Sequence, residues 1–101
     1  MRFDPTKELS DKEALKIITE IVEYGFIHYS DHVKEQMKKR GYEAQDVEYI
    51  LTNGNITKKD FSEEHQNWEY RIEGTDLDGD EGKIITAVIA INRLIIITVL
   101  G

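Results

Sequence analysis

Cysteine is missing from the 101 residues, and proline occurs once. Without cysteine, the chain has no disulfide framework, no thiolate-ligated zinc or iron–sulfur centre and no thiol nucleophile. It also lacks the apolar run of a signal peptide behind Met1 and the ~20 consecutive apolar residues that a membrane-spanning helix needs. With 40% hydrophobic and 33% charged residues, these absences predict a folded cytoplasmic protein that does not contact a membrane.

Positive charge is scarce in this sequence. Lysine and arginine total 13 against 20 aspartates and glutamates, which gives a net charge of −7. Domains that bind nucleic acid usually carry clustered positive charge, because they must neutralise phosphates. The only locally basic segment is 34–40, which reads Lys-Glu-Gln-Met-Lys-Lys-Arg. Any contact with RNA or DNA is therefore expected to depend on this segment or on a partner protein.

The first half of the chain has the apolar period of helices. Residues 1–9 are polar and are predicted to be a loosely held N-terminal arm ahead of a single domain, 10–101. Ser10 opens a capping box with Glu13, and Ser30 is a second cap that precedes a helix ending at glycine. Residues 26–29 are predicted to be a short extended link. The predicted helices cover 11–24, 31–40 and 44–53.

The second half changes to a period of two, which is typical of strands. Residues 83–91 and 94–100 are nearly continuous β-branched runs, so they are predicted to be a hairpin of central strands. Segment 55–61 is predicted to be an edge strand, and 68–74 a strand with one buried face. The predicted class is α+β, with three N-terminal helices packed on one face of a three- to four-stranded antiparallel sheet.

The segment Tyr29–Gly41 resembles the helix of a bacterial family known mainly as a domain of unknown function, which reads H-x(3)-R-M-x-x-R-G. Gln36 stands where that pattern has arginine. The resemblance continues through 46–54, 68–74 and 97–99, so it covers roughly residues 10–100 in the expected order. It implies kinship with the RelE-like, ParE-like and BrnT-like toxins, in which helices precede a small antiparallel sheet.

This resemblance implies a toxin of a toxin–antitoxin system that cleaves RNA without a metal, paired with a small DNA-binding antitoxin. Such cleavage needs an acid and a base, and cations that stabilise the phosphate. His32 is the expected acid or base, because histidine titrates near neutral pH. Arg40 and Arg71 are expected to bind phosphate if the second helix packs beside strand 68–74. In the alternatives, His32 is partly buried and bonded to backbone while Arg40 completes the helix end, or these residues bind a partner.

Other constellations predict less chemistry. His28, His32 and His65 would make a three-histidine metal site only if they met, and no carboxylate joins them at ligand spacing, so no metal is expected. Segment 76–81 lacks the glycine and glutamate positions of a calcium loop, and it is predicted to be a solvated turn. Trp68 and Tyr70 alternate with charged residues as in a half-buried strand, although both would be able to stack on bases.

The sequence has no phosphate-binding glycine loop and no dinucleotide-binding turn, so no cofactor is expected. Two functions stay open. One is the toxin-like domain, with RNA and an antitoxin protein as partners. The other is a non-catalytic protein-interaction module, which the acidic composition favours.

Overall fold

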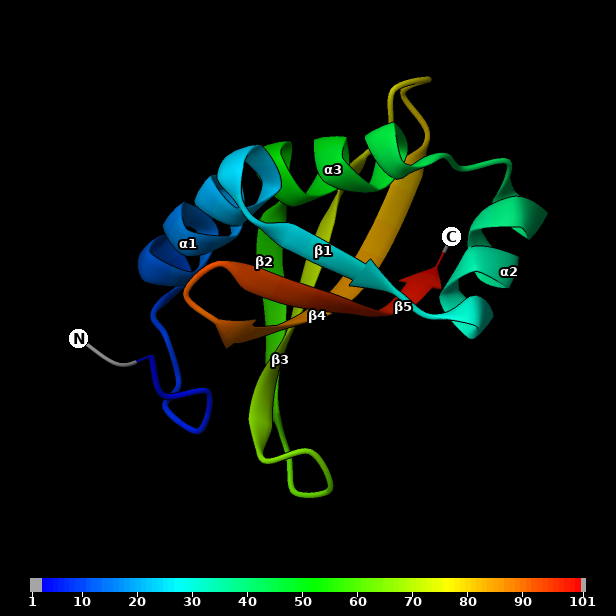
Figure 1. Ribbon diagram of the computed structural model, residues 1–101. Coiled ribbons are helices and arrows are strands. Elements are labelled where there is room, and N and C mark those ends of the chain that lie inside the picture. The colour runs from blue at the N-terminus through cyan, green and yellow to red at the C-terminus, as the bar shows by residue number, and fades with distance from the viewer. Residues whose placement is uncertain (1–2, 101) are drawn as a thin grey trace.

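The computed structural model describes residues 3–100, which form three helices and five strands (Figure 1). One strand lies between the first two helices in the chain, and the other four strands follow the third helix. Met1 and Arg2 of the predicted arm, and Gly101 of the predicted domain, lie outside the described residues. The elements are α1 (Asp11–Tyr24), β1 (Phe26–Tyr29), α2 (Asp31–Arg40), α3 (Ala44–Asn53), β2 (Asn55–Ser62), β3 (Asn67–Thr75), β4 (Glu81–Ala90) and β5 (Arg93–Leu100).

Local capping fixes the ends of the helices. The Ser10 hydroxyl accepts a hydrogen bond from the amide of Glu13 at 3.2 Å, and the Glu13 carboxylate accepts one from the amide of Ser10. Ser30 caps α2 in the same way through the amide of Val33. Gly41 ends α2 in the left-handed conformation, with φ at 72°, which glycine adopts without steric cost. The three predicted helices are confirmed.

The sheet differs from the prediction in two respects. It has five strands in the order β1-β5-β4-β3-β2, and it is mixed, because β1 pairs with β5 in parallel while the other pairs are antiparallel. Segment Phe26–Tyr29, predicted to be a link, is the fifth strand. Since β1 lies between α1 and α2 in the chain, the helices do not all precede the strands. A four-residue strand is too short to show a period, and its partner β5 is far away in sequence.

The predicted central hairpin is confirmed: β4 is the middle strand of the sheet and β5 is next to it, between β4 and β1. The side chains that these two strands contribute to the core beneath the helices are Ile84, Val88, Leu94, Ile96 and Val99. Figure 1 shows α1 and α3 together along one side of the sheet, and α2 beside the end of β5. The buried cluster takes residues from all three helices and from the sheet, among them Ala14, Ile18, Val33, Ile50, Leu51, Tyr70, Ile72, Ile84 and Ile96.

The opposite surface of the sheet, here called the open face, carries the alternate side chains. One cross-strand row of this face is fixed by the strand register, and it consists of His28, Ile95, Ala87, Glu69 and Asp60. A neighbouring row contains Ile85 and Arg71, which are directly paired between β4 and β3. Along these two rows the open face is apolar at Ile95, Ala87 and Ile85 and charged at Arg71, Glu69 and Asp60.

The N-terminal arm is held more firmly than its polar composition indicates. The indole Nε1 of Trp68 donates to the carbonyl of Thr6 at 2.9 Å, and the amide of Leu9 donates to the hydroxyl of Tyr70 at 2.9 Å. Tyr70 is buried and Trp68 packs against the core, so the prediction of a half-buried strand is confirmed. No helix within residues 3–100 is long and apolar enough to cross a membrane.

Candidate functional site

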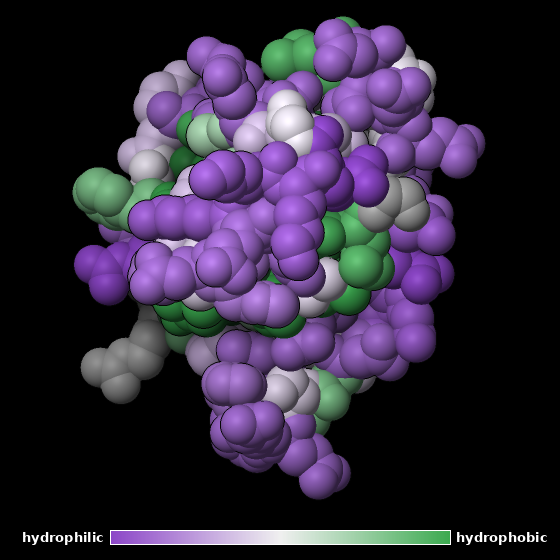
Figure 2. All heavy atoms as spheres, turned by 90° about the vertical axis from the view of Figure 1, so that its right-hand side faces the viewer, coloured by the Kyte–Doolittle hydropathy of each residue, from purple (hydrophilic) through white to green (hydrophobic). Residues whose placement is uncertain are grey.

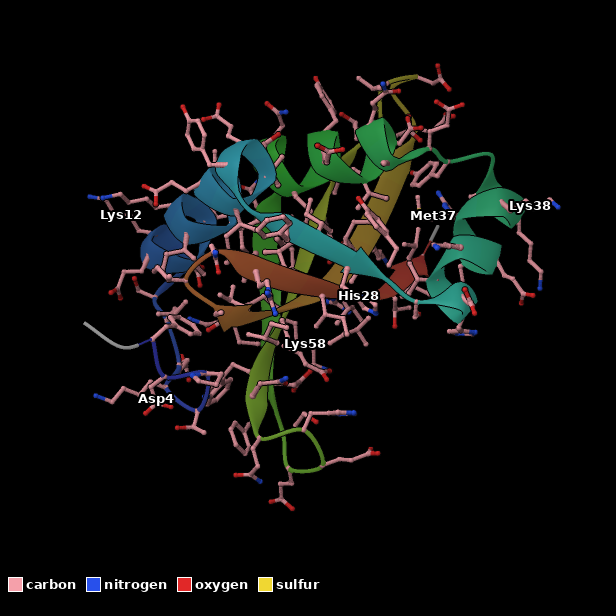
Figure 3. The ribbon with its side chains drawn as sticks, viewed as in Figure 1. Asp4, Lys12, His28, Met37, Lys38 and Lys58 are labelled. Carbon is pink, nitrogen blue, oxygen red and sulfur yellow. The ribbon has the colours of Figure 1, made fainter. Side chains whose placement is uncertain are left out.

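His32 lies in the first turn of α2 and is exposed. Within residues 3–100 its ring makes no hydrogen bond and no ion pair, so the alternative in which a backbone bond holds a partly buried His32 is wrong. The outer surface of α2 is almost wholly hydrophilic, as Figure 2 shows. Met37 points from α2 toward the sheet while Lys38 points outward (Figure 3). The imidazole of His32 is thus available to a ligand.

Arg40, at the other end of α2, is engaged within the protein. Its Nη2 donates to the hydroxyl of Tyr42 at 3.2 Å and to the carbonyl of Glu81 at 3.3 Å. The guanidinium also lies over the Tyr42 ring, 4.7 Å from its centroid. These contacts tie the end of α2 to the start of β4. They favour a structural role for Arg40, and the predicted phosphate-binding role stays a prediction.

Asp76 extends this network beneath the turn between β3 and β4. The side chain is 5% exposed, and its Oδ1 accepts from the amides of Asp78 and Asp80 at 2.9 and 3.0 Å. Burial by itself would raise the pKa of the Asp76 carboxyl. The hydrogen bond from Tyr42, the two amides and the charge of Arg40 outweigh burial and hold this pKa below its usual value. The segment is the predicted turn, and its exposed residues surround one buried carboxylate whose Oδ1 accepts two backbone amides.

Arg71 projects from β3 on the open face. Its Nε donates to Thr57 Oγ1 at 3.0 Å and lies 3.2 Å from Glu73 Oε2. The hydrogen bond from Thr57, followed by the charges of Lys83 and Arg71, lowers the pKa of Glu73, so the carboxylate is ionised at neutral pH. The terminal nitrogens of Arg71 make no hydrogen bond within residues 3–100. Two contacts on Nε therefore orient the guanidinium and leave its outer fork open.

The three predicted site residues lie in three different surroundings. His32 and Arg40 are eight residues apart on α2, which is about 12 Å along the helix axis. Arg71, on β3, belongs to a polar group with Thr57 of β2 and Glu73 of β3. No hydrogen bond or ion pair within the described range joins any two of the three. The packing of the second helix beside strand 68–74, on which the phosphate-binding expectation depended, is not observed in the part of the chain that the structure describes: α2 packs against β5, and β4 lies between β5 and β3. A shared site for His32, Arg40 and Arg71 stays a prediction.

Sequence reasoning did not identify two further features. Gln36 Oε1 accepts a hydrogen bond from the amide of Val99 at 3.0 Å, beyond the point where β1 stops pairing with β5. A hollow at the opposite end of β1 is lined by Phe26, Ile27, His28, Ile89, Arg93 and Leu94. The sequence signal for this hollow was weak. Phe26 and His28 place two aromatic rings at alternate positions, but a segment of four residues is too short to establish the strand that forms the hollow.

The histidines are dispersed over the fold. His28 lies on β1, His32 on α2, and His65 in the turn between β2 and β3, where its amide donates to Ser62 Oγ. In the part of the chain that the structure describes, no three histidine, aspartate or glutamate side chains are grouped to hold a metal ion.

The fold and these contacts define an α+β domain whose helices cover one face of a mixed five-stranded sheet and leave the other face open. The chain belongs to the family described as a domain of unknown function, DUF4258, which matches residues 29–100. This confirms the predicted membership in a family of unknown function. The likeness to toxins and the helix pattern stay predictions. No curated protein and no solved structure matches the chain.

Proposed function

We propose that this protein is a toxin-like domain that binds single-stranded RNA on the open face of the sheet and cleaves it without a metal. The observation that carries the proposal is the arrangement of Arg71. Its Nε is held by Thr57 and Glu73, while its terminal nitrogens make no hydrogen bond within residues 3–100. A fixed guanidinium fork suits the paired oxygens of a phosphate, and it loses little side-chain freedom on binding.

The exposed His32 supports the catalytic part of the proposal. In this reaction the 2′-hydroxyl attacks the adjacent phosphorus, its proton passes to a base, and an acid protonates the departing 5′-oxygen. We assign His32 one of these two proton transfers, because its ring is exposed and has no partner in the described residues. Arg71 would stabilise the charge that develops on the phosphate oxygens. Arg40 would position the end of α2 through Tyr42 and Glu81.

The test is cleavage of a short labelled RNA by the purified protein with EDTA present. We expect His32→Ala to lower the cleavage rate about 100-fold or more and to change affinity little. Arg71→Ala should weaken binding about tenfold or more, as for the loss of a hydrogen bond to a charged group. His65→Ala is the matched control, since His65 is exposed in the turn between β2 and β3. RNA with deoxyribose at the cleaved position should bind and stay intact.

A second candidate is a non-catalytic protein-interaction module. It is favoured by exposed apolar side chains around the turn between β4 and β5, where Tyr24 is 84% and Ile91 is 60% exposed. Exposed apolar groups of this kind are typical of surfaces that bind other proteins. Equal RNA cleavage by the wild type and His32→Ala, or loss of cleavage in EDTA, would contradict the RNA proposal and leave this candidate in first place.

A further inference from the structure

The hollow beside β1 has the size of a small-ligand site. It is open to solvent, has a volume of about 360 Å³ and joins the beginning of β1 to the beginning of β5 and the end of β4. Phe26 forms part of its lining and is 64% exposed, although burial would favour an aromatic side chain by about 1.5–3 kcal/mol. The amide of Phe26 donates to the carbonyl of Asn92 at 2.9 Å, which fixes the backbone that carries the ring.

The charge of the hollow distinguishes it from the surrounding surface. Its lining contains His28 and the cation of Arg93 and has no carboxylate. Each of the four other hollows described has at least one aspartate or glutamate in its lining. The chain has a net charge of −7, so most of its surface repels anions. A hollow that holds a cation and no carboxylate favours the binding of an anion. The hollow thus combines an exposed aromatic ring with a cation.

The hollow also lies on the same face as Arg71. Phe26 is paired with Arg93, and His28 is paired with Ile95, in the row that continues across the sheet to Glu69. Strands are about 4.8 Å apart, so β1 and β3, which are three spacings apart, are separated by about 14 Å across the sheet. Arg71 also lies about five residues further along the strands than the row of Phe26 and Arg93, which adds an offset of roughly 17 Å in that direction. A few nucleotides of single-stranded RNA would bridge this distance. The strip between them is apolar, with Ile85 and Ile95 half-buried on the open face.

We propose that this hollow binds one nucleotide of a single-stranded RNA, with the base stacked on Phe26 and the adjoining phosphate paired with Arg93. His28 presents a second ring two residues along the same strand. This inference rests on the proposed function. It names a second subsite, distant from Arg71, that would bind another part of the same RNA strand. Stacking of bases on aromatic side chains, combined with nearby cations, is how proteins bind single strands with little sequence preference.

The experiment measures binding separately from cleavage, by fluorescence anisotropy with a labelled adenosine hexamer carrying 2′-O-methyl groups, which cannot be cut through a 2′-hydroxyl. Phe26→Ala should weaken binding about tenfold, as expected for the loss of one base stack, and Phe26→Trp should retain it. Tyr24→Ala is the matched control, because Tyr24 is exposed two residues earlier and lines a different hollow. An abasic hexamer should bind wild type and Phe26→Ala alike. Circular dichroism checks that each variant folds.

The outcomes separate the subsite from the proposed cleavage. Loss of affinity in Phe26→Ala, with none in Tyr24→Ala, supports the subsite even if unmodified RNA is never cut. Equal affinity of wild type and Phe26→Ala overturns the subsite, and cleavage that depends on His32 would still support the proposed function. If the wild type binds no hexamer, the subsite is overturned, and the exposed ring of Phe26 is then assigned to a protein partner.

Discussion

A single carboxylate organises the turn between β3 and β4. Asp76 is buried and accepts hydrogen bonds from Tyr42 and from the amides of Asp78 and Asp80. Burial opposes ionisation, and the three hydrogen bonds with the charge of Arg40 favour it more strongly. The folded pKa of Asp76 is therefore lower than the unfolded value of about 3.9. Ionisation of this residue stabilises the fold above that pH, and the contribution is lost as pH falls through the folded pKa.

We expect Asp76→Asn to lower the free energy of unfolding at about pH 7 and to lower it less at about pH 3, because the stabilisation by the ionised carboxylate declines once the pH is below the unfolded pKa of about 3.9. Urea unfolding followed by circular dichroism at the two pH values measures the difference. Asp78→Asn is the control, because the Asp78 side chain is exposed in the same turn. The same loss for Asp76→Asn at both pH values would mean that shape rather than charge makes Asp76 important.

Residue-scale predictions from the sequence succeeded where both partners are close in the chain. Ser10 and Glu13 are three residues apart, and their capping box forms as predicted. Arg40 was expected to bind phosphate, and its contact with Glu81 connects positions 41 residues apart. No spacing rule reveals a contact of that separation. The contacts of Arg40 could therefore be found only in the folded structure.

Strand β5 is paired with β1 along only part of its length. Its pairing with β1 stops at Tyr29 and Ile96, and β5 continues to Leu100. On this unpaired length the amide of Val99 donates to Gln36 Oε1 on α2. A helix side chain thus replaces the missing strand. This hydrogen bond is a structural reason for glutamine at position 36. An arginine there has no acceptor atom and would be unable to make the same bond.

Replacing Gln36 by leucine should destabilise the protein by about 1–3 kcal/mol, because the partly buried Val99 amide would lose its acceptor. Gln36→Glu keeps an acceptor oxygen and should cost less. Thermal unfolding of both variants gives the comparison, and hydrogen exchange at Val99 should accelerate only in the leucine variant. If the glutamate variant is destabilised as much as the leucine variant, the hydrogen bond is not the reason for the loss.

At the level of elements, length decides what the sequence reveals. The 14 residues of α1 and the 10 residues of β4 contain several repeats of their periods, and both were located from the sequence. The four residues of β1 contain too few, and this strand is formed by its parallel pairing with β5. Parallel pairing joins segments that are distant in the chain. The number of strands and the mixed sheet therefore followed only from the structure.

The molecule as a whole has two unlike sheet surfaces. One is buried beneath three helices and provides the core, and the other carries Arg71 and the hollow at Phe26. The RNA proposal places its ligand on the face of the sheet that the helices leave uncovered. This division predicts that stability depends on one face of the sheet and binding on the other.

Adjacent residues of β4 test this division. Ile84 is 0% exposed and faces the helices, while Ile85 is half-buried and faces away from them. Ile84→Ala should reduce the free energy of unfolding by about 2–5 kcal/mol, because it leaves a cavity in the core. Ile85→Ala removes the same atoms from a partly solvated surface, so we expect roughly half that loss or less. Chemical denaturation of the two variants at one protein concentration provides both values. Equal losses would show that the second face is also packed in solution, either by another copy of the chain or by a ligand that purifies with it. Dilution separates these two cases. It would lower the stability of the Ile85→Ala variant further only if a second copy covers the face.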